Sequence, residues 1–195
     1  MLKTFRLWLW VAVAALGLTA LVGAWLLRQP ETTSSFGGGV YSVLDQNGQK
    51  IDQTMFQGHP SMLFFGYTHC PDVCPTTMAE MAAWFGELGD EGKALHAYFV
   101  TVDPERDTPA IMGDYVNWVS DRITGVTGDP VEIAKMLKAW GIFSEKVPLG
   151  GDDYAMDHTA SVFLLNNKGE FEGTIAFREN TATAVGKLRN LLAKS

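Results

Sequence analysis

The sequence predicts an α/β domain built on a mainly parallel sheet, preceded by one N-terminal transmembrane helix. Two observations support this prediction: an uncharged apolar segment near the N-terminus, and short apolar strand patterns that alternate with amphipathic helix patterns along the rest of the chain. The length of 195 residues and the hydrophobic content of 47% allow one domain of ordinary size with a short appendage.

The appendage is residues 7–27, an apolar run of 21 residues without a charge, which can cross about 30 Å of hydrocarbon as a helix. Lys3 and Arg6 precede it and only Arg28 follows, so the positive-inside rule places the N-terminus in the cytoplasm and exports the rest. We therefore expect residues 1–28 to be a membrane anchor. A cleavable signal peptide is the alternative, because Val22-Gly-Ala24 resembles a cleavage site, although the run exceeds the roughly 7–15 residues of a usual signal core.

Residues 29–39 (QPETTSSFGGG) are rich in Ser, Thr and Gly and lack apolar periodicity, so we expect a flexible linker before a folded domain at residues 40–195. Three of the 15 basic side chains and none of the 22 acidic ones lie in the first 28 residues. The remainder carries 12 basic and 22 acidic side chains, a formal charge of −10. This charge excludes nucleic acid as a partner and suits either a basic protein partner or simple solubility.

The domain is expected to begin with a β-hairpin, because strand patterns at residues 40–44 and 49–51 flank Asn47-Gly48, a strong turn signal. Residues 62–66 (MLFFG) form a continuous apolar run, typical of a central strand buried on both faces. Pro75 suits the first turn of the helix that follows. The apolar face of this helix consists of Met78, Met81, Ala82, Phe85 and Leu88.

Two further strand and helix pairs follow. Residues 95–102 and 123–126 have strand patterns, and Thr108-Pro109 and Asp129-Pro130 each offer a cap and a first-turn proline for a helix. The side chains expected to face the core are Ile111, Met112, Tyr115, Val116 and Val119 in the first helix, and Ile133, Met136, Leu137 and Trp140 in the second.

The chain closes with strand patterns at residues 161–165 and 171–177, joined by a turn at residues 166–169, and with a helix at residues 183–193. The order βαβαβα followed by ββα predicts a thioredoxin-like arrangement. Ligands of such sheets bind beyond the carboxyl ends of the strands, and residues 66–75 lie at one of these ends.

Cys70 and Cys74 lie in this strand-to-helix turn, near a partly positive helix N-terminus that favours thiolates. Their C-x-x-x-C spacing is one residue longer than the redox motif C-x-x-C and can bring both sulfurs to one side of the first turn. Two converging thiolates suit a soft ion such as Cu(I), and they suit a disulfide equally well. The pair alone leaves copper binding and redox chemistry open.

His158 precedes the strand at residues 161–165, in a loop that faces the cysteine turn of a thioredoxin-like sheet. Thiol oxidoreductases place a cis-proline there, but no proline follows Pro148 in this sequence. A lone histidine is more often an ordinary surface or hydrogen-bonded residue. In this position it completes a trigonal set of two sulfurs and one nitrogen, which suits Cu(I) better than structural zinc with its four ligands.

Other polar residues are weaker candidates. His69 is an alternative ligand, although consecutive residues seldom point at one ion, and His59 and His96 are interpreted as structural. Asp72 and Asp157 either orient the site, with a hydrogen bond to His158, or serve as turn and capping residues.

Residues 103–109 (DPERDTP) end a strand and begin a helix, and we interpret them as a turn with an internal ion pair. The methionines on the helix faces are interpreted as core residues and not as copper ligands.

Three segments resemble the Sco/SenC family of copper-binding assembly factors of cytochrome c oxidase. They are FGYTHCPDVCP at residues 65–75, VTVDPERDTP at residues 100–109 and DYAMDHTASVFLLNNKG at residues 153–169. With the N-terminal anchor, the resemblance covers essentially the whole chain. It implies a thioredoxin-like fold with insertions and one copper, as Cu(I), Cu(II) or both, bound by Cys70, Cys74 and His158.

The resemblance also implies partners and a role. The leading hypothesis is a metallochaperone that receives copper from a donor protein and delivers it to the dinuclear copper site of a cytochrome c oxidase subunit. The alternative is an enzyme, a thiol-disulfide oxidoreductase in which Cys70 and Cys74 reduce the cysteines of that copper site. A peroxidase needs one cysteine only and gives His158 no role.

The expected location is the bacterial inner membrane, with a single span and the soluble domain in the periplasm. A mitochondrial inner membrane is the alternative, but no Arg- and Ser-rich transit peptide precedes the apolar segment.

Overall fold

The structure of the chain is a computed structural model that describes residues 8, 10, 17–19, 36–151 and 153–195. The chain divides into two units, residues 1–33 and residues 34–195. The described residues of the first unit are helical, but most of the predicted transmembrane helix lies outside the described residues. Among the described residues, no helix is both long enough and apolar enough to span a membrane.

The second unit is built on a seven-stranded sheet in the order β2-β1-β5-β4-β3-β8-β9. The pairs β3–β4 and β4–β5 are parallel, and the other neighbours are antiparallel. The strands of this sheet are β1 (Ser42–Asp45), β2 (Lys50–Asp52), β3 (Ser61–Gly66), β4 (His96–Thr101), β5 (Ile123–Thr127), β8 (Val162–Leu165) and β9 (Phe171–Ile175). This order confirms the predicted thioredoxin-like arrangement, including the N-terminal hairpin. The expectation of a mainly parallel sheet was wrong, because β1 and β8 both join the three parallel strands in antiparallel orientation.

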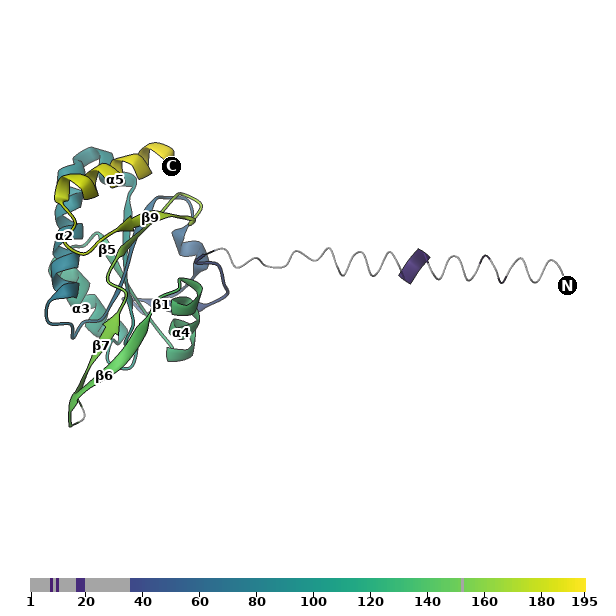
Figure 1. Ribbon diagram of the computed structural model, residues 1–195, viewed down its shortest axis with the longest axis horizontal. Helices are drawn as coiled ribbons and strands as arrows, with labels where there is room; N and C mark the ends of the chain where they lie inside the picture. Colours follow the sequence, from purple (N-terminus) through teal and green to yellow (C-terminus); the bar gives the residue numbers. More distant parts are fainter. Residues whose placement is uncertain (1–7, 9, 11–16, 20–35, 152) are drawn as a thin grey trace. The chain divides into compact units, whose positions relative to one another are not determined.

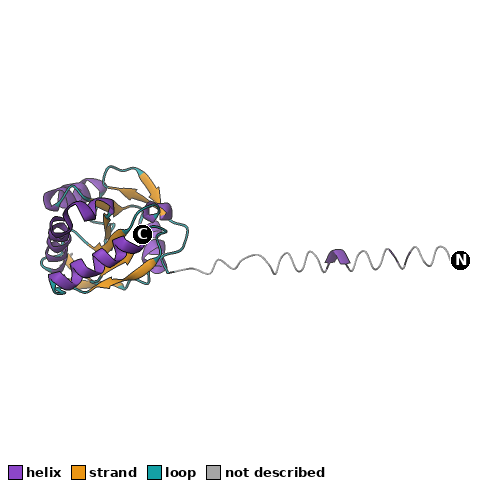
Figure 2. Ribbon diagram, turned by 90° about the horizontal axis from the view of Figure 1, so that it is seen from above, coloured by secondary structure: helices purple, strands orange, loops and turns teal. Residues whose placement is uncertain are grey.

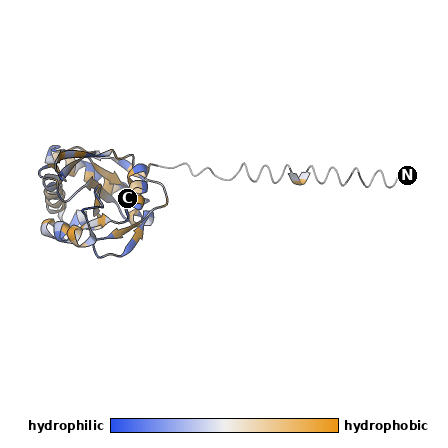
Figure 3. Cartoon of the chain, turned by 90° about the horizontal axis from the view of Figure 1, so that it is seen from below, coloured by the Kyte–Doolittle hydropathy of each residue, from blue (hydrophilic) through white to orange (hydrophobic). Residues whose placement is uncertain are grey.

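Helices cover both faces of the sheet, with α2 and α3 on one side and α4 on the other (Figures 1 and 2). The helices are α2 (Val73–Leu88), α3 (Pro109–Val119), α4 (Pro130–Ala139) and α5 (Thr181–Lys194), with short 3-10 segments η1 (Gln53–Phe56) and η2 (Gly89–Ala94). All six residues of β3 are buried, as expected for a central strand. Figure 3 shows hydrophobic residues along the strands, where the two helical layers meet the sheet.

The side chains that form the core largely agree with the predicted helix faces, but Ala82 is only partly buried and the buried Trp84 was not predicted. Met112 and Val116 are buried, and Tyr115 and Val119 pack partly against the core, but Ile111 is 39% exposed. The prediction that Ile111 faces the core was wrong, because the buried stripe of α3 is narrower than the sequence pattern.

The C-terminal part of the predicted linker packs on the domain. Phe36 contacts the rings of Trp140 and Phe171, and the Gly37 amide donates a hydrogen bond to the Ala139 carbonyl at 2.9 Å. A Cβ at Gly37 would lie 2.4 Å from Trp140, and its φ of +82° also favours glycine. Residues 36–39 therefore belong to the folded unit.

A second, two-stranded sheet was not predicted from the sequence. It consists of β6 (Ser144–Gly150) and β7 (Asp153–His158), an antiparallel hairpin that projects from the body of the domain (Figure 1). Most side chains of β6 are exposed, so its pattern lacks the apolar alternation of a half-buried strand. This hairpin carries His158.

His59 and His96 have a structural role, as predicted. Their rings stack with centroids 3.6 Å apart, and burial lowers the pKa of both side chains. Each therefore binds a proton more weakly in the folded than in the unfolded chain, so stability is full above about pH 6.5 and declines as the pH falls below it.

We expect the double variant His59→Gln/His96→Gln to lose less stability than wild type between about pH 7.5 and about pH 5.5, because the unfolded variant gains no protons at these positions. Urea unfolding of the copper-free protein measures this difference. Equal pH dependence in the two proteins would show that the pair does not titrate with folding.

Candidate metal centre

The two cysteines lie where the sheet meets α2. β3 ends at Gly66, and Cys74 lies in the first turn of α2 with its side chain fully buried, whereas Cys70 is half-buried in the preceding loop. A Cβ at Gly66 would come within 2.7 Å of the Cys74 sulfur and 2.7 Å of Phe99. Glycine at the end of β3 thus provides the space that the Cys74 sulfur occupies.

His158 is the last residue of β7, and the prediction that it lies in a loop was wrong. Its Nδ1 lies 2.9 Å from the carbonyl oxygen of Thr159, so we assign the ring proton to Nδ1, which donates to this oxygen. Nε2 then has a free lone pair. Nε2 lies 3.6 Å from the Cys74 sulfur. The rings of Tyr67 and Phe64 meet the imidazole at 5.8 Å and 6.3 Å and fix its orientation.

The three predicted ligands converge. The sulfur atoms of Cys70 and Cys74 and a ring nitrogen of His158 all lie within 4.8 Å of one another. Metal–sulfur bonds of about 2.3 Å and metal–nitrogen bonds of about 2.0 Å place the ligand atoms of a trigonal site roughly 4 Å apart. These separations therefore fit a three-coordinate metal after only small shifts.

The two thiols differ in proton affinity. A hydrogen bond from the Cys74 thiol lowers the pKa of Cys70, and the Cys74 amide, 3.3 Å from the Cys70 sulfur, supports the thiolate. The same interaction with Cys70, together with burial, raises the pKa of Cys74. Cys70 is thus the accessible thiolate, and Cys74 is the buried proton donor.

We expect iodoacetamide at about pH 6 to modify Cys70 and to spare Cys74, because alkylation requires an accessible thiolate. Peptide mapping by mass spectrometry of the reduced, copper-free protein measures the two sites separately. Equal labelling of the two cysteines would contradict this division of roles.

The weaker candidates lie outside the ligand set. His69 is largely exposed and contacts Thr68 at 3.1 Å. Asp157 is exposed, and the Thr159 carbonyl takes the place predicted for its carboxylate, so Asp157 does not orient His158. Asp72 is exposed, and its carboxylate caps no backbone amide of α2 but accepts a hydrogen bond from the Thr76 hydroxyl at 3.3 Å and lies 3.8 Å from Arg178.

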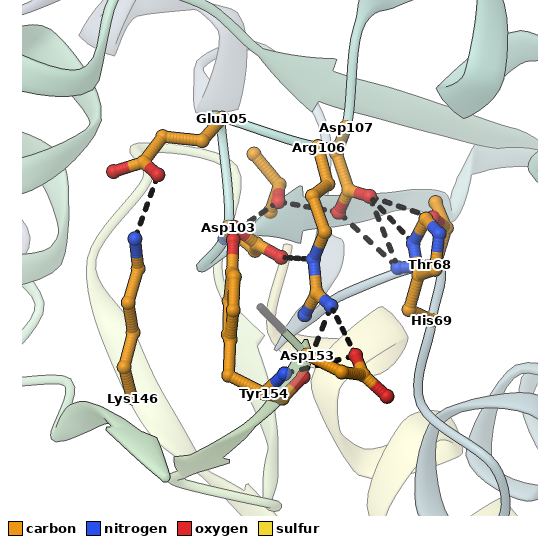
Figure 4. Close-up of polar contacts among 10 residues, drawn as sticks. Thr68, His69, Asp103, Glu105, Arg106, Asp107, Lys146, Asp153 and Tyr154 are labelled. Atoms are coloured by element: carbon orange, nitrogen blue, oxygen red, sulfur yellow. Dashed lines mark hydrogen bonds and ion pairs between the residues drawn. The ribbon is translucent and has the colours of Figure 1, made fainter. Parts of the chain in front are cut away.

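A buried carboxylate in the segment 103–109 fixes the cysteine loop (Figure 4). Asp107 is fully buried and accepts hydrogen bonds from the Thr68 hydroxyl at 2.6 Å, the Thr68 amide at 3.1 Å and the Thr101 hydroxyl at 2.6 Å. Burial raises the pKa of Asp107, and these hydrogen bonds oppose that shift. Thr68 is two residues before Cys70, so Asp107 sets the path of the loop that carries the first thiol.

The same segment also holds the hairpin, through a cluster of Asp103, Arg106 and Tyr154 (Figure 4). The predicted ion pair is confirmed, since Arg106 Nε binds the Asp103 carboxylate. Arg106 also donates to the Tyr154 carbonyl at 3.0 Å and stacks over the Tyr154 ring at 3.7 Å, while the Tyr154 hydroxyl donates to Asp103 at 2.8 Å.

The interpretation of residues 103–109 as a turn with an ion pair was therefore incomplete. Asp103 and Asp107 support the metal centre from the carboxyl end of β4, and Tyr154 supports it from β7. The position of this segment at the carboxyl end of a predicted parallel strand was the signal available in the sequence.

Residues 29–193 match the SCO1/SenC family. The chain belongs to the SCO1/SenC family. The mitochondrial SCO2 homolog of Bos taurus is 34% identical over 175 residues, which cover 82% of this chain and 66% of that protein. The chain spans 59% to 66% of the length of the first curated relatives it matches.

Solved SCO1/SenC structures share the fold. The copper-bound ScoI of Bradyrhizobium japonicum is 38% identical with a TM-score of 0.73, over 78% of this chain and 98% of that one. The copper-bound yeast Sco1 is 27% identical with a TM-score of 0.76, over 83% of this chain and 90% of that one. The fold is thus the mixed α/β, thioredoxin-like fold of this family.

Proposed function

We propose that this chain is a copper metallochaperone that binds one copper ion through Cys70, Cys74 and His158. The convergence of two sulfurs and one imidazole nitrogen within 4.8 Å carries this proposal. Thiolate and imidazole ligands suit copper, whereas structural zinc sites are closed by four Cys or His ligands. The copper in the structures of the Bradyrhizobium and yeast relatives supports the same assignment.

The copper is cargo, and its destination is the dinuclear copper site of a cytochrome c oxidase subunit, as the family resemblance implies. A separate donor protein supplies it. Residues 1–28 anchor the chain in the bacterial inner membrane, the residues that follow connect this anchor to the domain, and the thioredoxin-like unit carries the centre in the periplasm. Lys3 and Arg6 before the apolar run support this orientation.

A second function uses the same thiols. Cys70 combines accessibility with a lowered pKa, and a buried thiol lies beside it, which is the arrangement of an attacking and a resolving cysteine. A thiol-disulfide reductase with this pair would prepare the cysteines of the oxidase's copper site. His158 has no task in that exchange, whereas a chaperone needs it as a ligand.

An experiment in cells grown in low copper distinguishes the two functions. We expect His158→Ala cells in low copper to lose most of their cytochrome c oxidase activity, and His69→Ala cells to keep it, because His69 lies outside the ligand set. Oxidase activity in membranes, normalised to the amount of chaperone, is the measurement. Normal oxidase activity in the His158→Ala cells would contradict the chaperone function and favour the reductase function.

A further inference from the structure

The hairpin strand β7 points alternate side chains toward the metal centre. Tyr154 and His158 both face this side, because the Tyr154 hydroxyl donates to Asp103 and His158 Nε2 lies 3.6 Å from the Cys74 sulfur. Side chains two residues apart on a strand point to the same face. Met156 lies midway between them and is 8% exposed, whereas its neighbour Asp157 is exposed. The Met156 side chain therefore lies on the inner face, next to His158.

Met156 also lines the cavity at the centre. This cavity has a volume of about 280 Å³, and Met156 shares its wall with Cys70, His158 and Tyr67. Most of the remaining wall has no side-chain ligand atom, and its two carboxylates, Asp72 and Asp157, belong to exposed residues. Besides Cys70 and His158, Met156 is the residue of this lining whose side chain contains a soft donor atom, and the same side chain packs against the hydrophobic core.

We propose that Met156 is a further ligand of the copper centre, which binds Cu(I) through its thioether sulfur. This inference rests on the proposed copper function. A thioether is a soft, neutral ligand that prefers Cu(I) to Cu(II). The long, unbranched methionine side chain reaches into irregular spaces at little cost, so its sulfur can approach an ion held by His158, two residues along the strand.

The fourth ligand has a consequence for delivery. Copper transfer exchanges ligands one at a time, and the ion needs a partner whenever a cysteine of the chaperone leaves it. A weak thioether on the hairpin holds Cu(I) during that exchange without adding charge. Met156 thus favours the reduced ion and a gradual release, whereas the two thiolates provide most of the affinity.

Met156→Leu tests this role, because leucine has a similar volume and no sulfur. Met136→Leu is the matched control, since Met136 is fully buried on α4, a helix that packs on β1 and contributes nothing to the cavity. The full chain is loaded with Cu(I) alone or Cu(II) alone. Its affinities are measured by competition with a chromophoric chelator, and the sulfur atoms around Cu(I) are counted by X-ray absorption.

We expect Met156→Leu to lower the Cu(I) affinity about tenfold, the lower end of what losing a supporting group costs a metal site. The Cu(II) affinity should stay the same, so the Cu(II)/Cu(I) potential falls by about 59 mV. The Cu(I) centre should contain three sulfur atoms in wild type and in Met136→Leu, and two in Met156→Leu.

Two sulfur atoms in the wild-type Cu(I) centre would overturn the role of Met156 and leave the three-ligand centre intact, and this count requires no substitution. Equal Cu(I) affinities of wild type and a folded Met156→Leu would also overturn it. Failure of the wild-type chain to bind copper would overturn the proposed function itself.

Discussion

Replacement of His158 by alanine lowers the copper affinity of the reduced protein at least ten- to a hundredfold, because loss of a ligand costs at least as much as loss of a group that supports one. Cys70 and Cys74 remain and hold Cu(I) loosely, but the mixed set of sulfur and nitrogen is gone. Competition with a chelator, on protein kept reduced, measures the change.

The fold of this variant should persist. His158 ends a hairpin strand and is only half-buried, so its removal costs the hydrogen bond to Thr159, about 1 kcal/mol, and no core cavity. His69→Ala is the control and should bind copper as wild type does. A His158→Ala protein with wild-type affinity would remove His158 from the ligand set.

Replacement of Arg106 by alanine lowers the free energy of unfolding by about 3 kcal/mol, because breaking a buried ion pair leaves an uncompensated charge. Asp103 is 1% exposed and loses its guanidinium partner, and β7 loses its hydrogen bond at the Tyr154 carbonyl. Urea unfolding measures the stability. The copper affinity should fall as well, since the hairpin that carries His158 is held less firmly.

Lys146→Ala is the matched control for Arg106. Lys146 pairs with Glu105 at 2.7 Å in the same region, but both side chains are exposed to solvent, so its loss should cost much less stability than the loss of Arg106. Equal losses of stability in the two variants would contradict the importance of the buried pair. Lower stability with unchanged copper affinity in Arg106→Ala would show that the cluster stabilises the domain without positioning His158.

The sequence was sufficient to predict the strands and helices that bury one or both faces in the core. The run at residues 62–66 lies in the fully buried strand β3, and Pro109 and Pro130 lie in the first turns of α3 and α4 as predicted. These signals are local, because burial on one or two faces imposes a period on the chain. The position of the C-x-x-x-C turn was predicted in the same way, because this turn directly follows a central strand and ligands bind at the carboxyl ends of such strands.

The features that were not predicted depend on contacts between distant segments. The strand β6 has a mostly exposed pattern and is stabilised by its partner β7 and, through Lys146, by Glu105. The hydrogen bond from Thr68 to Asp107 joins residues 39 positions apart, and neither local sequence pattern predicts it. The carbonyl of Thr159, not the expected Asp157, orients His158, because a strand directs consecutive side chains to opposite faces.

Copper analysis of the reduced full chain tests the central claim most directly. The wild-type protein and the double variant Cys70→Ser/Cys74→Ser are loaded with Cu(I) without oxygen, freed of excess metal by a chelator of moderate affinity, and analysed for copper and protein. The centre of two thiolates and one imidazole predicts one retained copper per wild-type chain and none in the double variant. A wild-type chain that retains no copper, or a double variant that retains as much as wild type, would contradict the account.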